Sequence, residues 1–407
     1  MLKIFGKRPH YKGHIIMLAV IDGSSLGLSM GMVLLAMYII KYACDSFEDA
    51  SDYLGKEVYK MAPGVRGATL EAIASSLPEL FTTLFLLFMF NDVGGFAAGV
   101  ATCAGSAVFN AVIIPAVCIL AVTIKGVDGK IIDKLKLQSS TIIRDGIFFI
   151  LAELCLIFFL GTGKLVWWMG FALMGLYCVY FAFLMRGMGM ENDDEDEEDE
   201  EDEEDEERGF IGSLFTFDYN QLVFGGKDFT ATSAWIVLIL ATGTIAGACY
   251  LLSESVIISA DALGVEAYFT AVIFGAAATS VPDTVISYKD AMKGEYDDAV
   301  ANAIGSNIFD ICVALGFPLA LYSGLQVING GNGIIDLATG STPGAVQDLR
   351  IVLIILSIVI VGLFLSAPKE KDEDGSTTLL IGKGHGYSLL GLYVLWTGFV
   401  ISQVMGG

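Results

Sequence analysis

Two acidic residues of this chain each follow a proline inside a strongly apolar stretch of sequence. Glu79 follows Pro78 in the segment "AIASSLPELFTT", and Asp283 follows Pro282 in "AAATSVPDTVIS". On a helix, positions i, i−3, i−4 and i−7 share one face. Each carboxylate is therefore predicted to share its face with two hydroxyl groups and an alanine. These neighbours are Ser76, Ser75 and Ala72 for Glu79, and Ser280, Thr279 and Ala276 for Asp283.

The two prolines add backbone oxygens to these groups. A proline has no backbone N–H, so Pro78 cannot donate to the carbonyl of Ala74, and Pro282 cannot donate to that of Ala278. A carbonyl released in this way can turn toward a cavity. Carboxylate, hydroxyl and carbonyl oxygens together are the ligands of hard cations such as Ca²⁺, Na⁺ and K⁺, and they do not suit Zn²⁺ or copper.

A second pair of motifs supplies further oxygen ligands. "GSAVFN" (105–110) places Ser106 and Asn110 four residues apart, and "GSNIFD" (305–310) does the same for Ser306 and Asp310. Residues at i and i+4 share a helix face. The alternative role for such small polar residues is helix packing, and it applies most readily to the serines.

Three carboxylates are therefore predicted to face one site: those of Glu79, Asp283 and Asp310, with Asn110 as a neutral fourth group. An ionised group in the middle of a membrane costs at least ~2.5–3.5 kcal/mol, so helix packing is a poor explanation for all three. Ca²⁺ neutralises two of the three charges. The third positive charge can come from K⁺, from Na⁺ or from a proton on Asp310.

The paired motifs form an internal repeat. Asp283 lies 204 residues after Glu79, and Asp310 lies 200 residues after Asn110, so a two-helix unit occurs twice. Counting the predicted membrane crossings places the turn of the first unit outside and that of the second inside. Inverted repeats of this kind are typical of secondary transporters with a site at the membrane midplane.

The composition sets the environment of these helices. The chain has 407 residues, is 55% hydrophobic and has a mean hydropathy of +0.67, which favours a lipid bilayer over water as its solvent. The sequence predicts an all-α polytopic membrane protein, because helices satisfy their own backbone groups in lipid. About ten spans are expected, at roughly 15–40, 66–90, 95–122, 142–161, 164–186, 234–260, 266–288, 298–322, 350–367 and 386–404.

An acidic segment divides the chain. Residues 191–207 are almost all Asp or Glu and contribute much of the net charge of −23, so we expect a disordered loop. The predicted parts are a first transmembrane half (1–186, with the first repeat at about 66–122), an acidic loop (187–233) and a second half (234–407, with the second repeat at about 266–322). With this loop in the cytoplasm, seventeen Lys and Arg residues lie in inside connections and only Lys164 and Arg350 in outside ones, and the basic N-terminal tail (Lys3, Lys7, Arg8 and Lys12) is the one segment that dissents. Both termini are then expected on the opposite side, in a membrane that the sequence does not identify.

The motifs resemble a known family. "GATLEAIASSLPELF", "GSAVFN" and "ATSVPDTVISYKDAMKGEYDDAVANAIGSNIFDICVALGFP" are similar to the two alpha-repeats of the cation/calcium antiporter superfamily, and most similar to the potassium-dependent sodium/calcium exchangers. The similarity covers roughly 42–116 and 266–318. It implies that Glu79 and Asp283, with their hydroxyl neighbours, are the central ligands, flanked by Asn110 and Asp310. It also implies that Asp310 takes the position used for K⁺, and that the first and sixth helices slide to alternate access.

One residue departs from the family pattern. Glu71 stands where the family usually has an apolar or small residue, two turns from Glu79 toward the inside. It is either a mouth-lining or ion-paired residue, or an added ligand or proton carrier on the inward path.

The sequence thus predicts an antiporter that exchanges Na⁺ for Ca²⁺ by alternating access, with or without K⁺ carried together with Ca²⁺. A Ca²⁺/H⁺ antiporter, a K⁺-independent Na⁺/Ca²⁺ exchanger and, from a different class, a cation channel are the alternatives. No HExxH motif occurs in the spans, so we expect neither an enzyme nor a cofactor. The expected partners are the lipid bilayer and the transported ions, with no nucleic acid, and a homo-oligomer remains open.

Overall fold

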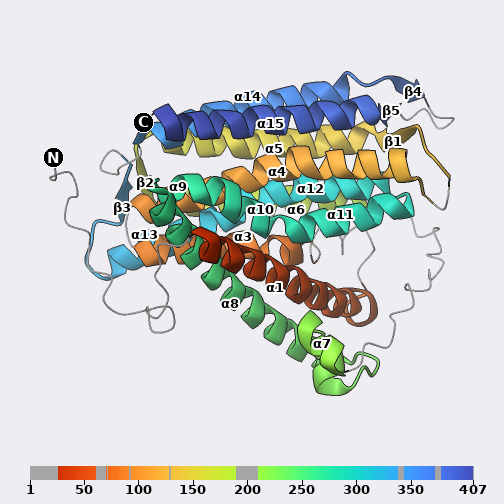
Figure 1. Ribbon diagram of the computed structural model, residues 1–407, viewed down its shortest axis with the longest axis horizontal. Helices are drawn as coiled ribbons and strands as arrows, with labels where there is room; N and C mark the ends of the chain where they lie inside the picture. Colours follow the sequence, from red (N-terminus) through yellow and green to blue (C-terminus); the bar gives the residue numbers. More distant parts are fainter. Residues whose placement is uncertain are drawn as a thin grey trace.

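The computed structural model describes residues 26–60, 70, 72–90, 93–127, 130–188, 210–337, 343–371 and 377–406. These residues are mostly helical, and helices overlap all ten ranges predicted to span the membrane (Figure 1). The long helices are α1 (Leu26–Tyr53), α3 (Ala72–Phe90), α4 (Val93–Lys125), α5 (Ser139–Gly161), α6 (Trp167–Met188), α8 (Ala231–Leu263), α11 (Val281–Lys293), α12 (Tyr296–Phe309), α13 (Gly316–Ile328), α14 (Pro343–Leu365) and α15 (Lys383–Gly406). The shorter ones are η1 (Leu54–Val58), α7 (Phe210–Thr216), η3 (Asn220–Phe224), α9 (Ala267–Thr270), η4 (Ala271–Gly275), α10 (Ala276–Thr279) and η5 (Asp310–Ala314). Glu71 and the acidic segment 191–207 lie outside the described residues.

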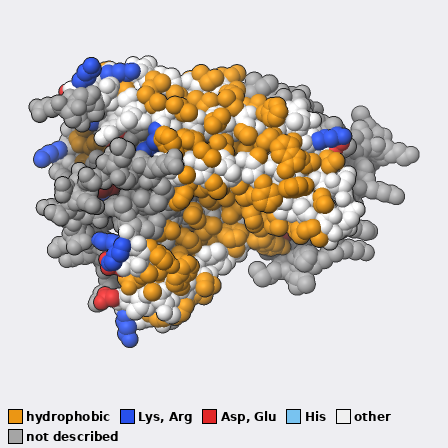
Figure 2. Space-filling model, turned by 180° about the vertical axis from the view of Figure 1, so that it is seen from behind, with side chains coloured by type: hydrophobic (Ala, Val, Ile, Leu, Met, Phe, Trp, Pro, Cys, Tyr) orange, Lys and Arg blue, Asp and Glu red, His pale blue; other side chains and the backbone are white. Residues whose placement is uncertain are grey.

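The surface of the helical body is that of a multi-pass membrane protein. Among the described residues, six helices are long and apolar enough to cross a bilayer, and the pair Ala267–Thr279 and Val281–Lys293, bent by 40°, would make a seventh. Large apolar side chains face outward, such as Phe158 at 68% and Leu395 at 72% exposure. Figure 2 shows such side chains as a broad apolar band with Lys and Arg near its two ends. The all-α polytopic fold class is confirmed, whereas a count of ten crossings remains a prediction.

Short strands tie the loops together at the two ends of the bundle. At one end β1 (Lys134–Gln138) pairs antiparallel with β5 (Thr377–Gly382), which also pairs with β4 (Lys369–Lys371). At the other end β2 (Lys164–Val166) pairs with β3 (Ile334–Asp336) (Figure 1). These contacts link the two halves of the chain outside the helical core.

The first helix differs from its prediction in where it ends. The predicted span 15–40 ends where the run of apolar residues ends. In the structure, α1 continues to Tyr53 and then into η1. Its last part is amphipathic, with Ala50 and Ser51 buried, so it packs against the protein. Hydropathy reports where apolar residues stop, and a helix can continue past that point when one face remains buried.

The helices of the second repeat are interrupted at Ser280 and Asp310, whereas α3 and α4 of the first repeat are continuous over their described residues. The segment that carries Asp283 contains the π-helical turn η4 and breaks at Ser280, whereas α3 runs through Pro78 without a break. Likewise α12 passes into the π-helical turn η5 at Asp310, whereas α4 is continuous through Asn110. π-helical turns occur often at functional sites because they change which side chains face inward.

Candidate cation site

The predicted site residues come together in the interior, where α3, α4, α11 and α12 meet (Figure 1). All ten of their polar side chains are fully buried. They are Ser75, Ser76, Glu79, Ser106, Asn110, Thr279, Ser280, Asp283, Ser306 and Asp310. The two alanines, Ala72 and Ala276, are also buried. We refer to these twelve residues as the cation cluster.

Ser106 is the central contact of the cluster. Its hydroxyl lies 3.0 Å from Glu79 Oε1 and 2.9 Å from Asp310 Oδ2, so it links the acid of the first repeat to that of the second. It also lies 3.0 Å from the hydroxyl of Ser280, and the amide of Asn110 donates to it at 3.4 Å. One serine thus joins both repeats at the middle of α4.

Asp283 is held by a serine and an amide. Ser306 donates to Asp283 Oδ1 at 2.8 Å, and Asn110 Nδ2 donates to Asp283 Oδ2 at 3.1 Å. The contact of Ser306 with Asp283 in the second repeat matches the contact of Ser106 with Glu79 in the first. Residues at equivalent motif positions therefore make equivalent hydrogen bonds.

Several oxygens of the cluster have no hydrogen-bond partner among the described residues. They are Glu79 Oε2, Asp310 Oδ1, Asn110 Oδ1 and Ser76 Oγ. An unsatisfied buried acceptor costs about 1–3 kcal/mol, and more when the group is charged. A carboxylate, an amide and a hydroxyl oxygen gathered in this way are the ligands expected for a hard cation.

The hydroxyls of Ser75 and Thr279 also contact their own backbone. Ser75 donates to the carbonyl of Ala72 at 3.4 Å, and Thr279 donates to that of Ala276 at 3.1 Å. A hydroxyl that donates in this way keeps its lone pairs free to bind a cation. The two alanines thus orient the hydroxyls, and their carbonyls are already engaged.

Thiols from two other helices contact the backbone around Pro78. The carbonyl of Ala74, which Pro78 leaves without its helical donor, accepts from Cys44 Sγ of α1 at 3.6 Å. The carbonyl of Pro78 accepts from Cys249 Sγ of α8 at 3.6 Å. The carbonyl that Pro78 releases thus accepts a weak hydrogen bond from α1, and its use as a cation ligand remains a prediction.

Two asparagines of α12 are site residues that sequence reasoning missed. Asn302 Nδ2 donates to the carbonyl of Asp283 at 3.4 Å and to Ser287 Oγ at 3.0 Å. Asn307 Nδ2 donates to the carbonyl of Ala107 on α4 at 3.1 Å. Asn302 lies one turn before Ser306, and this i, i+4 spacing of polar residues in an apolar helix was the available signal.

The buried carboxylates of the cluster need positive charge to balance them when they are ionised. In the described part of the chain, the hydrogen bonds of its three carboxylates come from hydroxyl and amide groups, with no Lys, Arg or His. No group of three His, Cys, Asp or Glu side chains there could hold a metal ion by itself. Hydroxyl and amide oxygens must therefore complete any coordination shell, which suits Ca²⁺ and alkali ions and not transition metals.

Ser106 also limits the protonation states of the cluster. Its hydroxyl has one proton, yet Glu79 Oε1 and Asp310 Oδ2 both lie within 3.0 Å. Ser106 can donate to only one of them. The other contact is favourable when that carboxyl holds a proton or when a cation lies between the two groups.

Removing the Ser106 hydroxyl tests its central position. We expect Ser106→Ala to raise the KM for Ca²⁺ roughly 10- to 100-fold, because a hydrogen bond to a charged group contributes about 1.5–3 kcal/mol. Ser306→Ala is the matched control and should have a smaller effect, since Ser306 contacts only Asp283 in the cluster. Ion-dependent Ca²⁺ uptake measured over a range of Ca²⁺ concentrations compares the two. An equal or larger effect of Ser306→Ala would contradict the assignment.

Comparison with known proteins agrees with this arrangement. The family model described as "Sodium/calcium exchanger protein" matches residues 28–186 and 233–402. Mouse "Sodium/potassium/calcium exchanger 4" is 33% identical over 155 residues, which are 38% of this chain and 23% of that protein. Rat "Sodium/potassium/calcium exchanger 3" is 36% identical over 152 residues, which are 36% of this chain and 22% of that protein. The matches thus cover less than a quarter of these relatives.

Two solved structures share the fold. The H⁺/Ca²⁺ exchanger CAX has a TM-score of 0.64 and 15% identity, covering 90% of this chain and 81% of that one. The sodium-calcium exchanger NCX_Mj has a TM-score of 0.52 and 19% identity, covering 91% of this chain and 98% of that one. At these identities the likeness shows the fold alone. The family model spans both halves and both motif pairs, and the chain belongs to the sodium/calcium exchanger protein family.

Proposed function

We propose that this protein is a secondary active antiporter that exchanges Na⁺ for Ca²⁺ across a membrane by alternating access. The observation that carries the proposal is the cation cluster, in which three buried carboxylates, hydroxyls and an amide from both repeats converge, with no basic residue among their hydrogen-bond partners in the described part of the chain. Glu79, Asp283, Asp310 and Asn110 act as the principal ligands. The hydroxyls of the cluster complete the shell.

Exchange follows from the use of one set of ligands for two kinds of ion. Ca²⁺ and several Na⁺ ions compete for the same oxygens, so one kind must leave before the other binds. A cluster without its ions retains uncompensated buried charge, which disfavours a change of state when it is empty. Because the loaded site changes state more readily than the empty one, inward movement of one ion is coupled to outward movement of the other.

The helices that would move pack against α3, which carries Glu79. Among the described residues, the largest interhelical contact joins α1 to α8, and this pair hydrogen-bonds α3 near Pro78 through Cys44 and Cys249. Thiols are weak hydrogen-bond donors, so these two hydrogen bonds break at small cost. We infer that α1 and α8 slide together over α3 to open the site to each side in turn. We further propose that the two repeats are inverted, with the acidic loop in the cytoplasm and both termini on the opposite side.

K⁺ is the ion we assign to Asp310. Its Oδ1 has no hydrogen-bond partner among the described residues, and we assign to it the charge that Ca²⁺ leaves uncompensated. We expect Asp310→Asn to remove any requirement for K⁺, because the amide is neutral and supplies the same oxygen. Ca²⁺ uptake into Na⁺-loaded proteoliposomes, measured with external K⁺ and with an inert organic cation in its place, tests this. A mutant that still requires K⁺ would place the K⁺ site elsewhere.

A Ca²⁺/H⁺ antiporter is the second candidate, and the shared proton of Ser106 is the observation that favours it. If a proton on Glu79 or Asp310 replaces the cation, protons can serve as the exchanged ions. The same proteoliposomes distinguish the two functions. Uptake that needs internal Na⁺ supports Na⁺/Ca²⁺ exchange, whereas uptake that is indifferent to Na⁺ but driven by a pH gradient supports proton exchange. Ca²⁺ flux without any counter-ion would indicate a channel and overturn both.

A further inference from the structure

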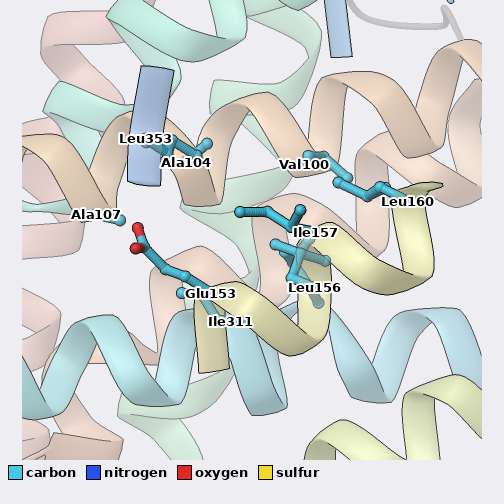
Figure 3. A pocket seen from close by; sticks show the side chains of 10 residues that line it. Val100, Ala104, Ala107, Glu153, Leu156, Ile157, Leu160, Ile311 and Leu353 are labelled. Carbon is cyan, nitrogen blue, oxygen red and sulfur yellow. The ribbon is translucent and has the colours of Figure 1, made fainter. Parts of the chain in front are cut away.

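A second buried carboxyl group lies outside the cation cluster. Glu153, in the middle of α5, is 3% exposed, and its Oε2 has no hydrogen-bond partner among the described residues. It borders a cavity between α4, α5, η5 and α14. The volume available to the centre of a water molecule in this cavity is about 20 Å³. This is enough for about one water molecule. Figure 3 shows the carboxyl group of Glu153 pointing toward Ala107 of α4.

The walls of this cavity exclude a metal cation. Its other lining residues are apolar, among them Val100 and Ala104 of α4, Ile311 of η5 and Leu353 of α14. The oxygens at hand are those of Glu153 and the hydroxyl of Ser357. Ca²⁺ takes 6–8 oxygen ligands, and a charge buried without a partner is strongly disfavoured. A proton is the ion that a single carboxyl group can hold in such a place.

The hydrogen bonds of Ser357 independently indicate a proton. Its hydroxyl lies 2.8 Å from Glu153 Oε1 and 3.0 Å from the carbonyl of Leu353, yet it has only one proton to donate. Both contacts are satisfied when Glu153 is protonated. The acid then donates to Ser357 Oγ, and Ser357 donates to Leu353.

The cavity and the cation cluster lie on two sides of the same helical segments. On α4, Ala104 and Ala107 line the cavity, whereas Ser106 belongs to the cluster. On η5, Ile311 lines the cavity and the preceding residue, Asp310, belongs to the cluster. A shift of either segment on cation binding therefore changes the surroundings of both sites.

We propose that Glu153 is a proton-binding site, separate from the cation cluster and linked to it through α4 and η5. Proton binding at Glu153 and cation binding at the cluster then influence each other equally, as linkage requires. Glu153 has no role in the exchange mechanism proposed above.

Other titratable groups near the cavity do not contact Glu153 in the described part of the chain; its one hydrogen bond there is to Ser357. Such groups on the surrounding elements are Cys103 of α4, Cys155 of α5, Tyr177 of α6, and Asp310 and Cys312 of η5.

Infrared spectroscopy of the full-length protein in lipid tests the proposal. The wild type should show the C=O band of a protonated carboxyl group that Glu153→Gln abolishes and that Ser357→Ala shifts to higher frequency, because the acid loses its acceptor. Adding Ca²⁺ should change this band. Glu254→Gln, which removes a carboxyl that accepts from Tyr250 on an exposed part of α8, should leave it unchanged.

Each part of the proposal can fail separately. Identical spectra of the wild type and Glu153→Gln in the carboxyl region, from mildly acidic to mildly alkaline pH, would show that Glu153 holds no proton. A band that does not respond to Ca²⁺ in a protein that binds Ca²⁺ would overturn the link to the cluster. The band should persist without Ca²⁺ in Glu79→Gln, so failure of the proposed exchange function leaves this test intact.

Discussion

Replacing Glu79 by Gln, or Asp283 by Asn, is expected to abolish Ca²⁺ uptake while leaving a folded protein in the membrane. Each substitution removes one of three buried negative charges. It also places an amide N–H₂ beside a serine hydroxyl that donates to the carboxylate in the wild type. Removing one partner of a buried charged contact costs roughly 3–5 kcal/mol, so the affinity for Ca²⁺ should fall at least about 100-fold. Radioactive Ca²⁺ uptake into Na⁺-loaded proteoliposomes measures this, with size-exclusion chromatography as the check on folding.

Glu254→Gln is the matched control for these variants. It makes the same chemical change on α8, where the carboxyl group accepts from Tyr250 at 3.1 Å in an exposed hydrogen bond. Uptake by this variant should equal that of the wild type. Normal uptake by Glu79→Gln or Asp283→Asn would show that these residues are not the principal ligands.

The composition of the cluster could be predicted because the spacing of its residues is local. Ser75, Ser76 and Glu79 fall on one helix face through the helical period alone, and Ser106 and Asn110 do the same. The repetition of both patterns 200 or so residues later indicated that two such faces meet. The structure places all of these side chains in one buried region, although their role as ligands remains a proposal.

The connections within the cluster could not be predicted in the same way. Ser106 lies 204 residues from Asp310 and 174 from Ser280, and such contacts depend on how the helices cross. The Glu153 contact with Ser357 also spans 204 residues, and no repeated motif marks it. Hydropathy and helical period describe one helix at a time, so they assign no partner to a buried acid.

The sequence patterns also did not predict that the helix continuity differs between the two repeats. The two Pro–acid motifs are alike, yet the helix is continuous at Pro78 and broken at Ser280, before Pro282. The π-helical turn η4 directly precedes the broken segment and packs tightly against α4. A Pro–acid motif therefore does not by itself specify whether the helix is continuous at the proline.

Gly105→Ala is expected to disrupt the cluster although it changes no ligand. A Cβ at this position would lie 2.2 Å from the carbonyl oxygen of Val272 and 2.6 Å from Cβ of Ala276. Both obstacles are parts of η4 and α10 that cannot rotate away, so α4 must move and carry the neighbouring Ser106 with it. Overpacking of this kind costs about 1–3 kcal/mol or more. We expect a lower melting temperature and at least a tenfold loss of Ca²⁺ uptake.

Gly305→Ala provides the comparison, because Gly305 is the equivalent residue of the second motif. A Cβ there would meet only Tyr180 Oη at 3.7 Å, which is an ordinary van der Waals contact. The melting temperature and the uptake of this variant should therefore match those of the wild type. If both alanine variants behaved alike, the close approach of α4 to η4 would not hold the cluster together. A loss confined to Gly105→Ala would show that the packing of α4, and not only the ligands it carries, fixes the geometry in which the three carboxylates meet.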